Sequence, residues 1–150
     1  MDLNYEKDSN QPGPIVEKKV FSYLGIATKA GKLLSGEFST EKAVKEGTAK
    51  LVIVASDASD NTKKMFTNMC TFYKVPIYFF GDKNELGHAI GKEFRASLVL
   101  LDKGLADTVE KQLNTLNHDS KTDTYRIVTS GGSEYGENES IWVSKRDRQT

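Results

Sequence analysis

The residues best suited to chemistry lie within residues 30–64, where glycines and lysines surround a short predicted helix. A helix that opens after Gly36 would present unpaired backbone N–H groups and the positive end of its dipole, and both favour a phosphate. Gly36 has no Cβ, so a nucleic-acid backbone could approach closely. Lys32 and Lys42 would neutralise phosphates without reading sequence. This combination favours a polyanion over a small metabolite, and we expect RNA.

Aromatic residues beside these positions could contact bases. An exposed Phe38 could stack on a base, a contact worth about 1–3 kcal/mol in single-strand binders. Phe94 and the stem of Arg95 could do the same from a second loop. Plainer interpretations stay open. Gly36 would then be only a turn glycine, the lysines solvated surface residues, and Phe38 half-buried packing.

Catalytic and metal sites are poorly supported by the sequence. Cys70 lies on an apolar helical stripe, which favours a core thiol over a nucleophile. Asp57 and Asp60 flank a strand end, where catalytic carboxylates often lie, but helix capping by these residues and Ser59 explains them better. His88 and His118 have no partner at ligand spacing, so we expect surface histidines. We therefore expect no enzyme activity, metal or cofactor.

Composition points to an intracellular protein. The net formal charge is zero, but the central part is mildly basic, and four lysines with no acid occur between Lys18 and Lys32. One face should therefore carry positive potential. The single cysteine favours a reducing compartment. No apolar run approaches the ~20 residues of a membrane span, and the first 14 residues lack the apolar core of a signal peptide. We expect a cytoplasmic location without membrane association.

Hydrophobic periodicity predicts alternating helices and buried strands. The unbroken apolar run at residues 51–55 is typical of a central strand covered on both faces. The alternation predicts an α/β protein, a three-layer α/β/α sandwich. The predicted helices are 16–30, 39–46, 61–73, 84–90 and 102–116, and the predicted strands are 33–34, 51–55, 75–80 and 97–101, with a loop at 92–95.

The two ends of the chain differ from its centre. Residues 1–15 are polar with clustered prolines and glycine, so we expect a flexible leader before a domain at residues 16–116. Residues 117–150 form a polar tail. Within it, residues 125–129 and 141–143 have strand propensity and could pair as a hairpin. Because an isolated hairpin is marginal in water, disorder or weak docking on the domain is the safer expectation.

Four blocks of this sequence resemble the L7Ae/L30e ribosomal-protein superfamily, and the resemblance is strongest to its bacterial YlxQ-type members. They occur in the right order within residues 17–113. The blocks are GKLLSG at 31–36, KAV at 42–44, KLVIVASD at 50–57 and LGHAIGKEFR at 86–95.

The resemblance implies an α/β/α sandwich around a four-stranded mixed sheet, and binding of structured RNA, typically kink-turns. It implies that residues 36–42 grip the bend while the loop at 92–95 packs against an extruded base. The candidate RNA-binding residues are Lys32, Gly36, Glu37, Phe38, Ser39, Lys42, Lys92, Glu93, Phe94 and Arg95.

One departure from the family pattern motivates a second hypothesis. Members that read kink-turns well carry Asn-Glu or Lys-Gln where this chain has Phe38 and Ser39. The alternative is a protein-interaction module that keeps the fold, has lost kink-turn selectivity, and binds a ribosomal protein or translation factor. A third hypothesis, an enzyme acting at Asp57 and Asp60, requires those acids to matter for turnover.

Overall fold

A computed structural model describes residues 12–119 and 126–127 of the chain. The helices are α2 (Pro12–Lys29), α3 (Glu37–Glu46), α4 (Asp60–Tyr73), α5 (Lys83–Ala89) and α6 (Lys103–Asp119). The strands are β1 (Leu33–Ser35), β2 (Leu51–Val54), β3 (Ile77–Phe79), β4 (Ser97–Leu100) and β5 (Arg126–Ile127).

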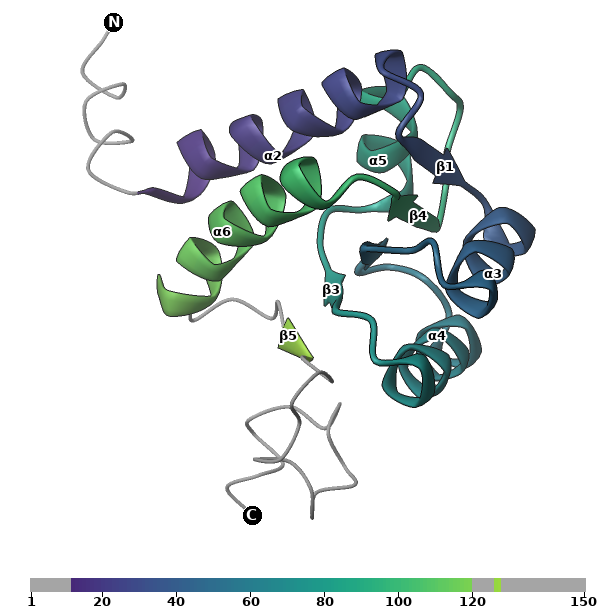
Figure 1. Ribbon diagram of the computed structural model, residues 1–150. Coiled ribbons are helices and arrows are strands. Elements are labelled where there is room, and N and C mark those ends of the chain that lie inside the picture. The colour runs from purple at the N-terminus through teal and green to yellow at the C-terminus, as the bar shows by residue number, and fades with distance from the viewer. Residues whose placement is uncertain (1–11, 120–125, 128–150) are drawn as a thin grey trace, which may run out of the picture.

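The strands form one mixed sheet in the order β1-β4-β2-β3-β5. β4 is antiparallel to both β1 and β2, whereas β2 and β3 are parallel. α2 and α6 lie side by side on one face with α5 beside α2, and α3 and α4 cover the other face (Figure 1). The predicted three-layer sandwich around a four-stranded mixed sheet is confirmed, with the short β5 added at one edge.

The central strands form the core because helices cover both of their faces. All four residues of β2 and all four of β4 are buried, which explains the unbroken apolar run in the sequence. Thr40 and Thr67 are also fully or almost fully buried. None of the described helices combines the length and apolar character that crossing a membrane requires.

Several helix boundaries differ from the sequence-based prediction. α2 begins at Pro12, four residues before Val16, because a proline is tolerated in the first turn of a helix. It therefore reaches into the segment expected as a leader. α3 begins at Glu37 and not Ser39, because Gly36 occupies the N-cap. α6 continues to Asp119, past the predicted end at residue 116.

β5 is the only described part of the chain beyond α6. It pairs with β3 in antiparallel register, with Ile77 opposite Ile127. Residues 126–127 of the first tail patch therefore contact the domain sheet. Its proposed hairpin partner, residues 141–143, and the leader residues 1–11 lie outside the described residues.

Candidate nucleic-acid interface

The N-terminal end of α3 presents free backbone amides. Gly36 is the N-cap, with φ 100° and ψ 158°, a conformation open essentially only to glycine. Its own N–H donates to the Ser97 carbonyl (3.0 Å), and the first intrahelical bond runs from the Thr40 N–H to the Gly36 carbonyl (3.0 Å). The amides of residues 37–39 precede that bond, and within the part of the chain that the structure describes no side chain caps them. The helix end is therefore suited to an anion.

The space beside Gly36 is open. A Cβ built at Gly36 would meet no atom within 4 Å. Phe38 is 75% exposed, so the interpretation of it as half-buried packing is wrong. α3 buries Thr40, Ala43 and Val44 instead, which turns Phe38 toward solvent. The exposed ring is available to stack on a base.

Two charged side chains of α3 would have opposite effects on a phosphate at this helix end. Lys42 forms an ion pair with Glu46 at 3.0 Å, and both side chains are more than half exposed. Such a surface pair contributes about 0–1 kcal/mol, so a phosphate can recruit the Lys42 ammonium at little cost. Glu37 is exposed in the first turn, where its carboxylate stabilises the helix but repels a phosphate.

The loop at residues 91–95 is held beside the same helix end. Arg95 Nε donates to Ser35 Oγ (3.0 Å), at the end of β1 next to Gly36, and Arg95 Nη1 donates to the Phe94 carbonyl (2.9 Å). The Arg95 N–H also donates to the Lys83 carbonyl (3.1 Å). Phe94 is 56% exposed. The loop is therefore fixed in place while its aromatic ring remains accessible.

Gly87 allows this loop to pack directly on α5. A Cβ at Gly87 would lie 2.3 Å from the Glu93 carbonyl oxygen and 2.5 Å from the Phe94 Cα. The Lys92 N–H donates to the Gly87 carbonyl (2.8 Å) and adds to this contact. Gly87 and Ser35 are not among the site residues predicted from the sequence. A glycine inside a predicted helix was the signal for Gly87, whereas nothing in the sequence marks Ser35.

The structure brings together most of the candidate residues and separates one of them. Residues 36–39 and 92–95 lie at one end of the sheet, joined by the contacts of Ser35 and Arg95. Lys32 lies at the other end of β1, because its carbonyl accepts from the Leu101 N–H (2.8 Å) beyond the opposite end of β4. Four residue steps of strand place its Cα about 13 Å from that of Gly36.

The carboxylates considered for catalysis have structural roles at helix N-termini. Ser59 is the N-cap of α4 and its Oγ accepts from the Thr62 N–H (3.1 Å). Asp57 does not cap α4 as predicted. Its Oδ1 accepts from the Lys83 N–H (2.9 Å), in the first turn of α5. Asp60 is the first residue of α4, where a carboxylate favours the dipole. Each of the three thus has a structural role.

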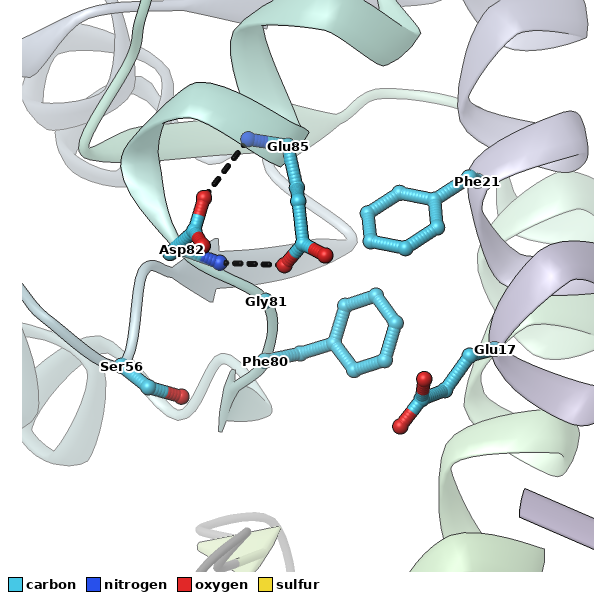
Figure 2. A pocket seen from close by; sticks show the side chains of 7 residues that line it. All are labelled: Glu17, Phe21, Ser56, Phe80, Gly81, Asp82 and Glu85. Atoms are coloured by element: carbon cyan, nitrogen blue, oxygen red, sulfur yellow. Dashed lines mark hydrogen bonds between the residues drawn. The ribbon is translucent and has the colours of Figure 1, made fainter. Parts of the chain in front are cut away.

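An acidic hollow of about 290 Å³ lies near the same end of the sheet, between α2 and the start of α5 (Figure 2). Its carboxylates belong to Glu17, Asp82 and Glu85, and Asp82 and Glu85 form a capping box with each other. Phe21 and Phe80 pack beside them, with ring centroids 4.9 Å apart.

The carboxylates of this hollow make it unfavourable for a polyanion. Partial burial, with a further contribution from the charge of Glu85, raises the pKa of Glu17 above its ordinary value of 4.5. Three carboxylates, those of Glu17, Asp82 and Glu85, line the hollow, so a phosphate would be repelled. Among residues 12–119 and 126–127, no group of three or more His, Cys, Asp or Glu side chains could hold a metal ion.

Cys70 and His88 lie in the environments expected of a core thiol and a surface histidine. Cys70 is fully buried, and burial raises the pKa of its thiol to about 12, so the predicted core thiol is confirmed. His88 is exposed in the last turn of α5, as expected. The side chain of His118 lies outside the described part of the chain.

The sequence is similar to one family of known proteins. The model of the ribosomal protein L7Ae/L30e/S12e/Gadd45 family matches residues 18–109. The RNA-binding protein YlxQ of Bacillus subtilis is 41% identical over 87 residues, which are 58% of this chain and 87% of that protein. The large ribosomal subunit protein eL30 of Saccharomyces cerevisiae is 33% identical over 93 residues, 61% of this chain and 89% of that protein.

Solved structures share the fold. A protein of unknown function from Bacillus halodurans C superposes with a TM-score of 0.63 at 38% identity, covering 64% of this chain and 97% of that one. The 15.5kD RNA binding protein of Giardia lamblia superposes with a TM-score of 0.58 at 22% identity, covering 69% of this chain and 88% of that one.

Proposed function

Because the chain belongs to the ribosomal protein L7Ae/L30e/S12e/Gadd45 family, we propose that it is a non-catalytic cytoplasmic protein that binds structured RNA. Relatives named as an RNA-binding protein and as a large ribosomal subunit protein support this proposal. The observation that carries it is the N-terminal end of α3, where no side chain caps the amides of residues 37–39 and the space beside Gly36 is open.

The contacts divide between two segments. A phosphate accepts hydrogen bonds from the amides at the α3 end, and Lys42 neutralises a neighbouring phosphate. The exposed rings of Phe38 and Phe94 stack on unpaired bases, with Arg95 held beside them. Lys92 and Glu93, exposed on the same loop, flank the base contact. This arrangement suits RNA with a bend or an extruded base.

Kink-turn RNA is the expected target class, and its discrimination from other RNAs is expected to be modest. Phe38 and Ser39 replace the polar pair that the family resemblance associates with kink-turn reading. A phenyl ring offers stacking but no hydrogen bond to a base edge, so it gives affinity with little sequence information. Structured ribosomal or other non-coding RNA fits this chemistry.

The presence of Phe38 in place of a polar residue supports a second candidate function. Phe38 is 75% exposed and Leu34 42% exposed near one end of the domain, and exposed apolar side chains suit a protein contact. A module with this fold would then bind a ribosomal protein or translation factor.

Crosslinking in cells, followed by sequencing of the bound RNA, tests the first function. We expect reads that concentrate on defined structured sites. A partner protein that remains bound after nuclease treatment, with no RNA crosslinks above background, would contradict RNA binding and support the protein-interaction function.

A further inference from the structure

The sheet topology gathers lysines along the edge opposite the α3 end. The beginnings of β1, β2 and β3 lie at this edge together with the end of β4, because β4 is antiparallel to β1 and β2. One lysine lies next to each of these strand ends. They are Lys32 directly before β1, Lys50 directly before β2, Lys74 three residues before β3 and Lys103 three residues after β4. We call these four residues the lysine edge.

Three of these lysines share one hollow. Lys50, Lys74 and Lys103 are exposed and line a hollow of about 310 Å³. Backbone hydrogen bonds set the order of these lysines along the edge. The Lys50 N–H donates to the Leu100 carbonyl (2.8 Å), which places Lys50 beside the end of β4. The Lys32 carbonyl accepts from the residue after Leu100, which places Lys32 at the far end of the row. With strands about 4.8 Å apart, a row across four strands spans about 14 Å.

Two acids in the hollow are already engaged. Both carboxylate oxygens of Asp107 lie 3.1 Å from Lys103 Nζ, an exposed pair that contributes about 0–1 kcal/mol and is easily exchanged for a phosphate. Glu110 accepts a hydrogen bond from the Tyr78 hydroxyl (2.9 Å). With three lysines and two carboxylates in its lining, this hollow keeps a net positive charge, whereas the one lined by Glu17, Asp82 and Glu85 is negative.

Lys74 lies at the hollow in a left-handed conformation. It has φ 60° and ψ 49° and is the only non-glycine residue with a positive φ among the described residues. The left-handed conformation costs a residue with a Cβ about 1–2 kcal/mol, and glycine would avoid that cost. This conformation ends α4, because Lys74 is its C-cap and its N–H donates to the Cys70 and Thr71 carbonyls. The lysine retains a charge at the hollow despite the strain.

We infer that the lysine edge binds phosphates of the same RNA where it extends past the segment held at the α3 end. This inference rests on the proposed function. The two surfaces are separated by about the length of β1, ~13 Å between Lys32 and Gly36, which a helical arm of RNA can cover. The contacts are to phosphate alone, so they add affinity and salt dependence without sequence preference.

The test uses the full chain and two labelled RNAs, a kink-turn hairpin with short arms and the same hairpin with one arm lengthened by a helical turn. Changing Lys32, Lys50 and Lys103 to Gln is expected to lower the slope of log affinity against log salt by about 2–3 for the long RNA. Binding of the short RNA is expected to stay unchanged. The matched control changes Lys18, Lys19 and Lys64, three exposed lysines that do not line the hollow, to Gln.

The outcomes separate the two claims. If the wild-type chain binds neither RNA, the proposed function and this inference both fail. If it binds both RNAs and the lysine-edge variant shows the wild-type slope, or the control loses as much slope, the inference fails alone.

Lys74→Gly provides a second readout. Relief of the left-handed strain is expected to raise the thermal midpoint, while loss of the charge lowers the salt slope for the long RNA by about 1. A raised midpoint with an unchanged slope would remove Lys74 from the binding surface.

Discussion

Arg95 donates a hydrogen bond from its Nε to Ser35 Oγ over 3.0 Å, across 60 positions of sequence. This contact joins the loop at residues 91–95 to the end of β1, immediately before the free amides of α3. Two segments that are distant in the chain thereby form one surface. The planar guanidinium has its donors in a fixed fork, so its position is better defined than that of a lysine ammonium.

Removal of this contact should loosen the loop. Ser35→Ala is expected to lower the free energy of unfolding by about 0.5–1.5 kcal/mol, because the part-buried guanidinium loses one partner. Amide hydrogen exchange in residues 92–95 should become faster. Ser59→Ala is the control, since it removes the α4 cap at a cost of about 1 kcal/mol. Equal exchange rates in the loop of both variants would contradict a positioning role for Ser35.

Gly36 and Gly47 provide a matched pair at the two ends of α3. Gly36 has φ 100° and Gly47 has φ 84°, so an alanine is strained at either position and should cost about 1–3 kcal/mol of stability. Only Gly36→Ala should also weaken RNA binding, because it puts a methyl group where the RNA backbone approaches. Affinity and urea denaturation are measured on both variants. A similar loss of affinity in both would mean that helix stability, and not access to the amides, controls binding.

Glu37 should oppose RNA binding. Its carboxylate lies in the first turn of α3 beside the amides that we assign to a phosphate. Glu37→Gln removes one repulsive charge, so the affinity for RNA should rise several-fold at low salt and less at high salt. The same change removes a favourable dipole interaction worth about 0.3–1 kcal/mol, so stability should fall slightly. An affinity that falls together with stability would argue that no phosphate binds there.

The thiol of Cys70 should be inert in the folded protein. Burial raises its pKa from 9.0 to about 12, so the reactive thiolate is absent at neutral pH. A thiol reagent should modify it only after denaturant unfolds the chain. Because the unfolded chain releases the proton at lower pH, this group lowers stability as the pH rises above 9. Modification of the native protein at pH 7 at the rate of an exposed thiol would contradict this account.

The sequence predicted the helices and strands better than it predicted their arrangement in space. The apolar run of β2 predicted a covered central strand because burial on both faces needs continuous apolar residues. The exposure of Phe38 was not predictable, because it depends on which face α3 turns to the sheet. Lys32 and Gly36 are close in sequence, yet an extended strand separates them, so they lie at opposite ends of the sheet. The lysine edge follows from strand order, which no local pattern specifies.

The central claim is that the amides at the α3 end receive a phosphate of RNA. It is tested most directly by following backbone amide resonances of the full chain during titration with a kink-turn hairpin. We predict that the largest shifts occur at residues 36–39, with a second group at 92–95. Saturable binding in which these amides do not move, while the largest shifts lie at the acidic hollow of Glu17 and Glu85, would contradict the claim.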